Sequence, residues 1–154
     1  MTSTLVELLR ERQRWRRDGL RVVFTNGCFD LLHPGHVALL EAARLEGERL
    51  VVGLNSDRSV AELKGPSRPV VPQPERAELL ESLECVDRVV VYDEGTPAAL
   101  IEALLPDVLV KGADWPLEAI VGRDVVERAG GRVVRVELLR GRSTTALLGR
   151  IRGT

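Results

Sequence analysis

Histidine, lysine, cysteine and aromatic residues are scarce in this chain of 154 residues. Both histidines, His33 and His36, lie in one tetrapeptide, and the two lysines, Lys64 and Lys111, each lie in a glycine-containing stretch between regular segments. The remaining 20 of the 22 residues counted as Lys or Arg are arginine. Arginine therefore supplies the general positive charge, and histidine and lysine are concentrated where the chain is irregular.

The scarcity of cysteine and the lack of long apolar runs exclude several classes of protein. Cys28 and Cys85 form neither a disulfide framework nor a CxxC motif, so we expect a reducing, cytoplasmic setting. No apolar run approaches the roughly 20 residues of a membrane span, and the N-terminus lacks the apolar region of a signal peptide, so no membrane partner is expected. The 44% hydrophobic content excludes simple disorder, and the length fits one domain, residues 1–154.

Charge is balanced, with a formal net charge of −1. This balance argues against a general nucleic-acid binder, so no nucleic-acid partner is expected. Arginines do cluster at both ends of the chain, and we interpret these clusters as solvated helix faces and strand edges (Arg12, Arg14, Arg16, Arg17, Arg132, Arg135, Arg140 and Arg142). The alternative, nucleic-acid binding through these arginines, predicts an affinity that falls steeply with salt.

Apolar periodicity and turn residues predict alternating helices and strands. Thr4 and Glu7 have the spacing of a capping box, which opens an N-terminal helix within residues 1–18 that we expect to pack on the domain. Its predicted apolar face carries Leu5, Leu8, Leu9 and Trp15. Further helices are predicted over 35–46, 59–63, 74–84, 97–105, 121–129 and 143–150, and strands over 21–25, 49–54, 88–92, 107–110 and 132–136.

Short, valine-rich strands separated by helices indicate an α/β fold with a five-stranded parallel sheet covered on both faces. Ligands of such sheets bind beyond the carboxyl ends of the strands. The irregular segments follow the strands as this rule requires, at residues 26–34, 55–57, 111–115 and 138–142. The longest loop, residues 66–74, is rich in proline and is a candidate lid.

The sharpest local signal is the segment of residues 25–36, TNGCFDLLHPGH. Gly27 allows a backbone to approach a ligand closely, and Pro34 and Gly35 open a helix whose free N–H groups favour an anion. His33 and His36 lie one turn apart on one face of that helix, so both rings can donate to the same anion, as an oxyanion site requires. A zinc site is the less favoured alternative, because zinc needs three or four protein ligands and the chain has no third histidine.

The segments TNGCFDLLHPGH, GLNSD, LKGPSRPV, PDVLVKGADW and GRSTT together resemble the HxGH nucleotidyltransferase superfamily, and most of all its D-glycero-D-manno-heptose 1-phosphate adenylyltransferase branch. The resemblance spans nearly the whole chain and implies a Rossmann-like, three-layer fold. It implies transfer of AMP from ATP to heptose 1-phosphate, giving ADP-heptose and pyrophosphate, with Mg²⁺ bridging the ATP phosphates and no metal-binding residue in the protein. It also implies a homo-oligomer and lipopolysaccharide precursor synthesis. The family's bifunctional members carry a sugar kinase, and this sequence shows neither a P-loop motif nor a kinase module, so a separate sugar kinase is expected upstream.

The acceptor of that reaction is a phosphate monoester that is largely ionised at neutral pH, so the protein needs cations and hydrogen-bond donors rather than a nucleophile. We therefore predict His33, His36 and Lys64 as the catalytic set. The resemblance implies a nucleotide-binding set made of Thr25, Asn26, Gly27, Cys28, Phe29, Gly35, Gly112, Asp114, Ser143, Thr144 and Thr145. It implies a substrate-binding set made of Asp30, Asn55, Asp57 and Arg68.

Structural roles are the alternatives for several of these residues. They include a surface position for Lys64, solvation of a strand end by Lys111, helix capping by Ser143, apolar filling by Cys28, sealing of a loop by Trp115, loop orientation by Asp30 and turn capping by Asn55 and Asp57. Arg142, directly before the STT sequence, departs from the neutral residue expected in the branch. Two other functions stay open, a cytidylyltransferase acting on glycerol 3-phosphate or a similar ester and a non-catalytic nucleotide-binding module. An adenylyltransferase of FAD synthesis, which would share the same scaffold, is a further enzymatic alternative.

Overall fold

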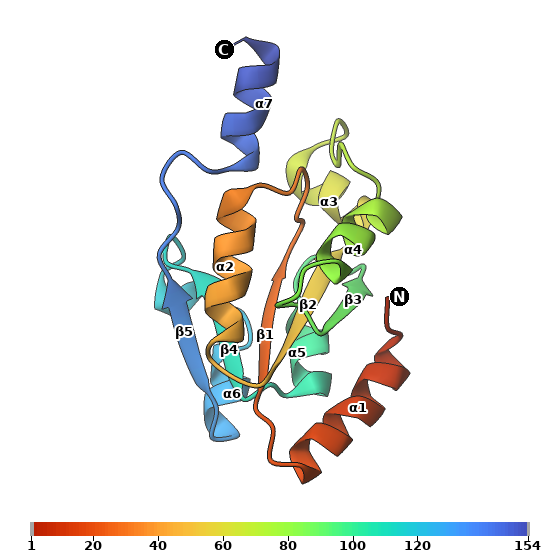
Figure 1. Ribbon diagram of the computed structural model, residues 1–154, viewed down its shortest axis with the longest axis vertical. Helices are drawn as coiled ribbons and strands as arrows, with labels where there is room; N and C mark the ends of the chain where they lie inside the picture. The colour runs from red at the N-terminus through yellow and green to blue at the C-terminus, as the bar shows by residue number, and fades with distance from the viewer. Residues whose placement is uncertain (1, 154) are drawn as a thin grey trace.

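Figure 1 shows the computed structural model of the protein, which describes residues 2–153. Five strands form one parallel sheet in the order β3-β2-β1-β4-β5. The strands are β1 (Val22–Gly27), β2 (Arg49–Asn55), β3 (Arg88–Tyr92), β4 (Val108–Gly112) and β5 (Arg132–Val136). The helices are α1 (Leu5–Arg17), α2 (Pro34–Arg44), α3 (Asp57–Lys64), α4 (Gln73–Glu81), α5 (Ala98–Leu104), the 3₁₀ turn η1 (Leu117–Ala119), α6 (Arg123–Arg128) and α7 (Thr144–Arg152).

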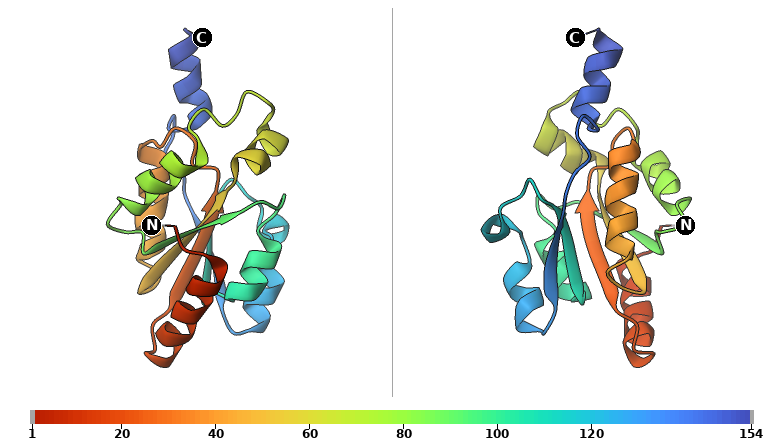
Figure 2. Two further views of the ribbon diagram at one scale, coloured as in Figure 1. Left: turned by 90° about the vertical axis from the view of Figure 1, so that its right-hand side faces the viewer. Right: turned by 60° about the vertical axis from the view of Figure 1, so that its left-hand side comes forward.

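Helices cover both faces of the sheet, which gives the three layers of a Rossmann-like fold (Figure 2). Alternate strand residues point to opposite faces, so each strand contributes to two cores. Phe24 and Leu109 pack with α1, α5 and α6 in one core, whereas Val23 and Val110 pack with α2 and α4 in the other. The predicted α/β fold with a five-stranded parallel sheet is confirmed.

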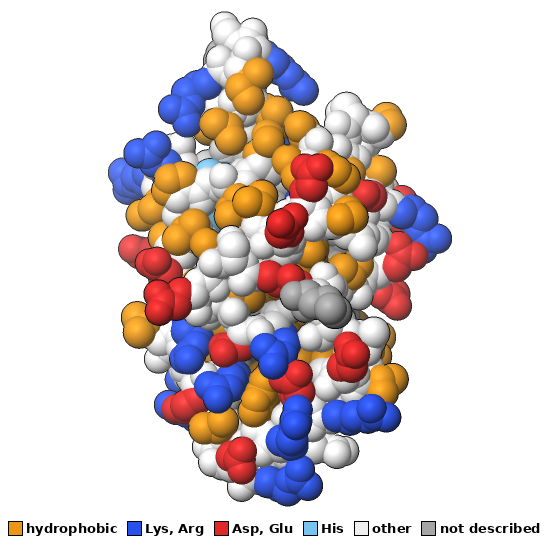
Figure 3. All heavy atoms as spheres, turned by 45° about the vertical axis from the view of Figure 1, so that its right-hand side comes forward, with side chains coloured by type: hydrophobic (Ala, Val, Ile, Leu, Met, Phe, Trp, Pro, Cys, Tyr) orange, Lys and Arg blue, Asp and Glu red, His pale blue; other side chains and the backbone are white. Residues whose placement is uncertain are grey.

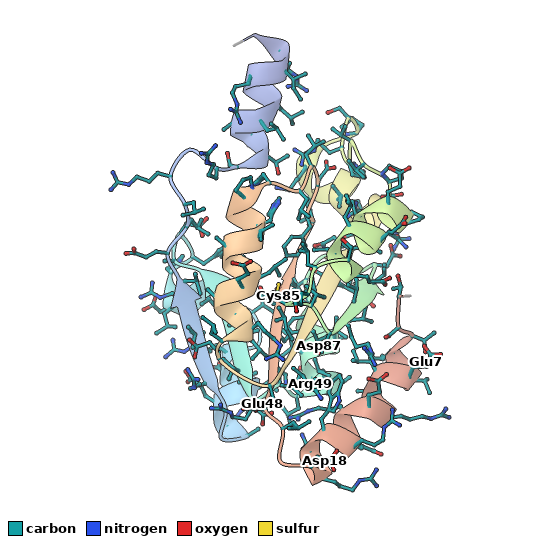
Figure 4. The ribbon with its side chains drawn as sticks, in the orientation of Figure 1. Glu7, Asp18, Glu48, Arg49, Cys85 and Asp87 are labelled. Atoms are coloured by element: carbon teal, nitrogen blue, oxygen red, sulfur yellow. The ribbon has the colours of Figure 1, made fainter. Side chains whose placement is uncertain are left out.

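Acidic side chains accept hydrogen bonds from the amino ends of neighbouring strands, at the end of the sheet far from α7 (Figure 4). The carboxylates of Glu48, Asp87 and Asp107 directly precede β2, β3 and β4. They accept hydrogen bonds from the backbone N–H groups of Arg21 (2.7 Å), Leu50 (2.8 Å) and Val22 (2.8 Å), respectively. Each carboxylate thus satisfies a donor at the beginning of the adjacent strand, where the ladder offers no partner.

The predicted elements are all present, with boundaries that differ by a few residues. β3 and β5 have the predicted bounds, and Thr4 forms the predicted capping box with Glu7. The helix predicted over 35–46 ends at Arg44, the helix predicted over 74–84 ends at Glu81, and the 3₁₀ turn η1 was not predicted. No helix within residues 2–153 is both long and apolar enough to cross a membrane.

Two predictions about α1 are wrong in detail. Leu5 is 41% exposed, so the apolar face consists mainly of Leu8 and Trp15. Arg12, assigned to a solvated face, is buried because its guanidinium closes the end of α5. It donates from Nε to the Leu104 carbonyl (3.2 Å) and from NH2 to the Leu105 carbonyl (2.7 Å). These bonds satisfy carbonyls left free where α5 ends. α1 therefore packs on the domain, and the predicted termini Met1 and Thr154 lie outside the described residues.

Strand order reverses between β1 and β4, because the chain passes from β1 to β2 and β3 on one side and returns to β4 and β5 on the other. Loops that follow adjacent strands diverge to opposite faces at such a reversal and leave a crevice between them. α7 lies beyond this end of the sheet (Figure 1). None of its residues is buried.

Candidate active site

A cavity of about 500 Å³ occupies the carboxyl end of the sheet at the reversal between β1 and β4. Its walls come from the loops after β1, β2, β3 and β4 and from the beginning of α7. Predicted site residues that line it are Asn26, Gly27, Cys28, Phe29, Asp30, His36, Asn55, Lys64, Arg68 and Thr144. Lys111, Trp115 and Tyr92 also line it. Segments distant in sequence thus meet where the strand-end rule places a ligand.

His33 and His36 form a stacked pair at the N-terminus of α2. Their ring centroids lie 3.7 Å apart with an interplanar angle of 24°. The Nδ1 of His33 accepts from the Gly35 N–H (3.1 Å), and the Nδ1 of His36 accepts from the His33 N–H (3.2 Å). Because each Nδ1 is an acceptor, a neutral ring carries its proton on Nε2 and can donate it outward.

The lowered pKa values of the two histidines indicate that both rings are neutral at pH 7 and can act as N–H donors. Burial lowers the pKa of His36 to about 4, with a smaller contribution from His33, and burial also lowers the pKa of His33. Both histidines are partly buried, and Figure 3 shows a small area of histidine surface on the face that it presents. At neutral pH the pair therefore offers two oriented N–H groups rather than two cations.

The loop between β1 and α2 holds this pair through a strained backbone. Phe29 (φ 46°) and Leu31 (φ 55°) adopt the left-handed conformation that side chains rarely take, a feature that clusters at functional sites. The Phe29 ring lies 5.3 Å from the His36 ring, centroid to centroid. Phe29 therefore packs against the histidine.

Gly35 allows a close approach between α2 and the segment before α7. A Cβ at this position would lie 2.8 Å from the Arg142 carbonyl oxygen and 2.8 Å from Cε1 of the His33 ring. Both distances are too short for a side chain, so glycine is required for this packing. The sequence predicted a helix opening and a nucleotide contact for Gly35, but not this packing. Arg142 thus reaches the site through its backbone.

Asp30 is fully enclosed and holds the loop of residues 66–72. Its carboxylate accepts from Nε of Arg68 (2.7 Å) and from the backbone N–H groups of Val70 (2.8 Å) and Val71 (2.9 Å). Burial alone raises the pKa of Asp30, but these hydrogen bonds outweigh it and the pKa is lowered. Its carboxylate therefore orients a protein loop, the alternative role suggested by the sequence, and Arg68 is held at the cavity wall.

Arg76 was missed by sequence reasoning, although its side chain is fully buried and joins three loops. It donates to the carbonyls of Cys28 (2.6 Å), Asn55 (2.9 Å) and Val71 (2.9 Å) and to the Asp57 carboxylate (2.8 Å). The same Asp57 oxygen accepts from the backbone N–H of Gln73 (2.8 Å). Asp57 therefore anchors Arg76 and the beginning of α4, and its predicted substrate contact stays a prediction. The pattern of apolar residues in α4 does not mark Arg76 as buried, because a charged residue is read as part of the exposed face.

A directed chain of hydrogen bonds crosses the strand ends beside the cavity. Asn26 Nδ2 donates to the Tyr92 hydroxyl (2.9 Å), which donates to Asn55 Oδ1 (2.9 Å). Asn55 Nδ2 donates to the Ser59 hydroxyl (2.9 Å), which donates to the Glu94 carbonyl (3.1 Å). Burial raises the pKa of Tyr92 to about 12, so the hydroxyl keeps its proton. Asn55 is therefore held by the protein, and its predicted substrate contact stays a prediction.

The two lysines enter the cavity from different elements. Lys64 is exposed at the end of α3, and Lys111 is half-buried in β4 with its Nζ 5.2 Å from the centroid of the Trp115 ring. Burial lowers the pKa of Lys111, opposed by the charge of Asp114. The cavity is therefore lined by three cationic side chains, Lys64, Arg68 and Lys111, and by one carboxylate, Asp30, which is paired with Arg68.

The STT sequence begins α7 at the edge of the cavity. Ser143 caps the helix by accepting from the Ala146 N–H (3.0 Å), and Thr144 Oγ1 donates to the Asp30 carbonyl (2.7 Å). Thr144 is a cavity residue, whereas Ser143 and Thr145 lie outside its lining. This bond ties the beginning of α7 to the loop after β1.

The other predicted nucleotide-binding residues lie at or near the same strand ends. Gly112 ends β4, and a Cβ there would meet Asp114 Oδ1 at 2.7 Å, so the Asp114 carboxylate folds back over this strand end. Burial raises the pKa of the Cys28 thiol. Thr25 is buried within β1, and its hydroxyl has no hydrogen-bond partner among residues 2–153. Gly112, Asp114, Gly35 and Thr25 do not line the cavity itself.

Within the described chain, no group of three or more His, Cys, Asp or Glu side chains is arranged to hold a metal ion. Asp30, which lines the cavity, and Asp57, at the beginning of α3, are engaged by Arg68 and Arg76, respectively. These residues fit a Mg²⁺ ion that is coordinated by nucleotide phosphates rather than by a protein cage.

Comparison with known proteins gives one family match. A family model described as cytidylyltransferase-like matches residues 24–139, a span that contains the histidine pair, both lysines and Arg76. Ser143 to Thr145 follow the matched span.

Individual relatives agree with this match. The chain is 62% identical over 138 residues to the bifunctional protein HldE of Mesorhizobium japonicum, covering 90% of this chain and 28% of that protein. It is 60% identical over 139 residues to HldE of Gluconacetobacter diazotrophicus, covering 90% and 29%. The chain thus spans less than a third of the length of these curated relatives. Among solved structures, a lipopolysaccharide core biosynthesis protein from Thermoplasma volcanium has a TM-score of 0.67 and 28% identity, covering 79% of this chain and 99% of that one.

Proposed function

Because the chain belongs to the cytidylyltransferase-like family and is a nucleotidyltransferase, we propose that it transfers AMP from ATP to D-glycero-D-manno-heptose 1-phosphate. The products are ADP-heptose and pyrophosphate. The observation that carries this proposal is the stacked His33–His36 pair, in which His36 lines a cavity with three cationic side chains, whereas His33 lies outside the lining of that cavity. The resemblance of GLNSD, LKGPSRPV and PDVLVKGADW to the heptose branch supports the acceptor.

The reaction needs no protein nucleophile. A phosphate oxygen of the acceptor attacks the α-phosphorus of ATP, a new P–O bond forms, and the bond to the oxygen bridging the α- and β-phosphates breaks. That bridging oxygen leaves with its electron pair as part of pyrophosphate. Attacking and leaving oxygens lie roughly in line, and negative charge spreads over the oxygens around the reacting phosphorus. In this proposal the two histidines donate to those oxygens, and Lys64 and Arg68 offset the charge of the phosphates.

The nucleotide would lie between α2 and α7. The N-termini of both helices point at this end of the sheet, so their free N–H groups and dipoles favour phosphate. Ser143, Thr144 and Thr145 would contact the leaving pyrophosphate, and Gly112 and Asp114 the base and ribose. Mg²⁺ would neutralise the ATP phosphates and arrive with them.

The biological setting is part of the same proposal. We infer a cytoplasmic enzyme, active as a homo-oligomer, that takes its sugar 1-phosphate from a sugar kinase and serves lipopolysaccharide precursor synthesis. The two free cysteines and the likeness to a solved lipopolysaccharide core biosynthesis protein support this setting.

The decisive experiment measures pyrophosphate release. The protein and Mg²⁺ are incubated with each nucleoside triphosphate and a panel of phosphorylated acceptors. Release with ATP and heptose 1-phosphate alone supports the proposal. Release with CTP and glycerol 3-phosphate would overturn it in favour of a cytidylyltransferase, and nucleotide binding with no release from any pair would indicate a non-catalytic module.

A further inference from the structure

Lys111 reaches the cavity from the opposite face of the sheet to the histidine pair. It lies two residues after Leu109, which packs in the core of α1, α5 and α6, so Lys111 points to that side. His36 belongs to α2, whose buried residues pack in the other core. The cavity therefore has two arms, and the arm on the α5 side is lined by Tyr92, Pro97, Lys111, Trp115, Ala119 and Val121. We call this part the Lys111 arm.

The ammonium group of Lys111 forms no ion pair within 4.0 Å in the described chain, and the charge of Asp114 acts on it only from a longer distance. Its Nζ lies over the face of Trp115, 5.2 Å from the ring centroid. The surrounding walls are largely apolar. A cation in such surroundings gains most when a ligand brings negative charge, since both partners are then shielded from water.

A hydrogen-bond acceptor near the same arm is also unused. The chain of hydrogen bonds that begins at Asn26 Nδ2 fixes the amide orientation and leaves Oδ1 without a partner. Oδ1 is enclosed, so a donor that approaches it must come from a group that enters the cavity. A ligand suited to the Lys111 arm therefore carries both an anionic group and hydroxyl groups, which is the chemistry of a sugar phosphate.

The geometry of in-line displacement also places the acceptor and the triphosphate of ATP in different parts of the cavity. The leaving pyrophosphate and the attacking oxygen must lie on opposite sides of the α-phosphorus. With the triphosphate at the N-termini of α2 and α7, the acceptor has to approach from the far side. The Lys111 arm is the part of the cavity that lies on that side.

We propose that Lys111 binds the acceptor rather than the nucleotide, and that the Lys111 arm selects a sugar phosphate. This inference rests on the proposed function for the identity of the donor, ATP. Lys111 is a specificity-determining residue in this assignment, and Trp115 orients its ammonium group.

The test measures the two substrates separately in Lys111→Met, which keeps the length of the side chain and removes the charge. Isothermal titration gives the Kd of ATP with Mg²⁺, and the Kd of the sugar 1-phosphate in the presence of α,β-methylene-ATP, in which a methylene group replaces the bridging oxygen that would leave. We expect acceptor affinity to fall about 10- to 100-fold, as for loss of a charged hydrogen bond, with ATP affinity unchanged. Lys111→Arg should restore part of the acceptor affinity. Arg10→Met, which removes one exposed charge from α1, is the matched control.

The outcomes distinguish this inference from the proposed function. An unchanged acceptor Kd in Lys111→Met, or a loss confined to ATP, overturns the role of Lys111 even when the wild-type protein forms ADP-sugar. Conversely, if the wild-type protein binds sugar phosphates without releasing pyrophosphate and Lys111→Met abolishes that binding, the role of Lys111 stands and the proposed reaction fails. Absence of sugar-phosphate binding to the wild-type protein overturns the inference.

Discussion

At the scale of single residues, the two nitrogens of the His36 ring have separate tasks. Nδ1 accepts from the His33 backbone and closes the beginning of α2, which leaves Nε2 as the donor toward the cavity. The two tasks can be separated by substitution, because the side-chain amide of asparagine approximates the position of Nδ1 and that of glutamine the position of Nε2.

We therefore predict that His36→Asn retains the fold and ATP affinity but loses turnover. Loss of one donor to a charge that develops in the transition state costs about 10²- to 10³-fold in rate. His36→Gln keeps a donor near Nε2 and should be the faster of the two variants. Pyrophosphate release and ATP titration measure both quantities. Wild-type turnover in His36→Asn would contradict the role of Nε2.

Burial of His36 also predicts a dependence of stability on pH. Its pKa of about 4 in the folded protein lies below the ordinary value of 6.5. Between these values the unfolded chain binds a proton that the folded chain does not, so stability falls as pH is lowered through this window. The slope is of order 1 kcal/mol per pH unit for one such group, and His33 acts in the same direction.

Urea denaturation at pH 7, 5.5 and 4.5 measures this slope. His36→Asn cannot take up the proton and should show a shallower decline than the wild-type protein. Equal slopes in the two proteins would show that His36 titrates normally in the folded state. NMR titration of the ring protons gives the pKa directly.

At the scale of elements, Arg76 fastens the loops that follow β1 and β2 to the segment before α4. Arg76→Met removes every hydrogen bond of its guanidinium and leaves three carbonyls and Asp57 without this donor. A buried hydrogen-bond acceptor left without its donor costs about 1–3 kcal/mol of unfolding free energy, whereas Asp57, whose side chain is 47% exposed, can bind water instead. Chemical denaturation should therefore show a loss of several kcal/mol, carried mainly by the three carbonyls.

Arg58→Met is the matched control for this prediction. Arg58 is exposed on α3 and pairs with Glu62 and Asp93 at the surface. Exposed ion pairs contribute about 0–1 kcal/mol, so the control should be close to wild-type stability. A similar small effect in Arg76→Met would mean that the loops are held by other contacts.

The contrast between Arg76 and the strands shows what the sequence could and could not predict. Valine-rich runs such as residues 88–92 and 132–136 predict strands from their composition alone. Thr4 and Glu7 predict the beginning of a helix, because the two residues that form the capping box are three apart in the sequence. Arg12 and Arg76 satisfy carbonyls that only the tertiary fold brings to them. Periodicity treats both as surface residues, and the cavity's Lys111 arm was likewise only an ambiguous strand end in the sequence.

At the scale of the whole molecule, the carboxyl ends of the strands form the candidate site, whereas the amino ends have a structural role. The carboxyl ends form the cavity, while the amino ends are closed by the carboxylates of Glu48, Asp87 and Asp107. Hydrogen bonds from Arg21 lower the pKa of Glu48 to about 2. Its stabilising effect is therefore fully present above its ordinary pKa of 4.5 and is lost as pH falls toward 2.

Glu48→Gln should accordingly be less stable than the wild-type protein at pH 7, and the difference should narrow at pH 3. Urea denaturation at the two pH values measures the change. Glu102→Gln, at an exposed position on α5, controls for removal of a negative charge. A difference that stays constant from pH 7 to pH 3 would contradict the assigned ionisation of Glu48.

Because strand order reverses at the cavity, different segments of the chain line its two sides. Residues 26–36 and 142–145 adjoin the cavity on one side of the sheet, and residues 92–97 and 111–121 on the other. Mutations in the second pair of segments can alter the arm around Lys111 while the histidine pair and its helix stay intact. Under the proposed function, a change of acceptor would therefore fall in these two segments and leave the histidine pair in place.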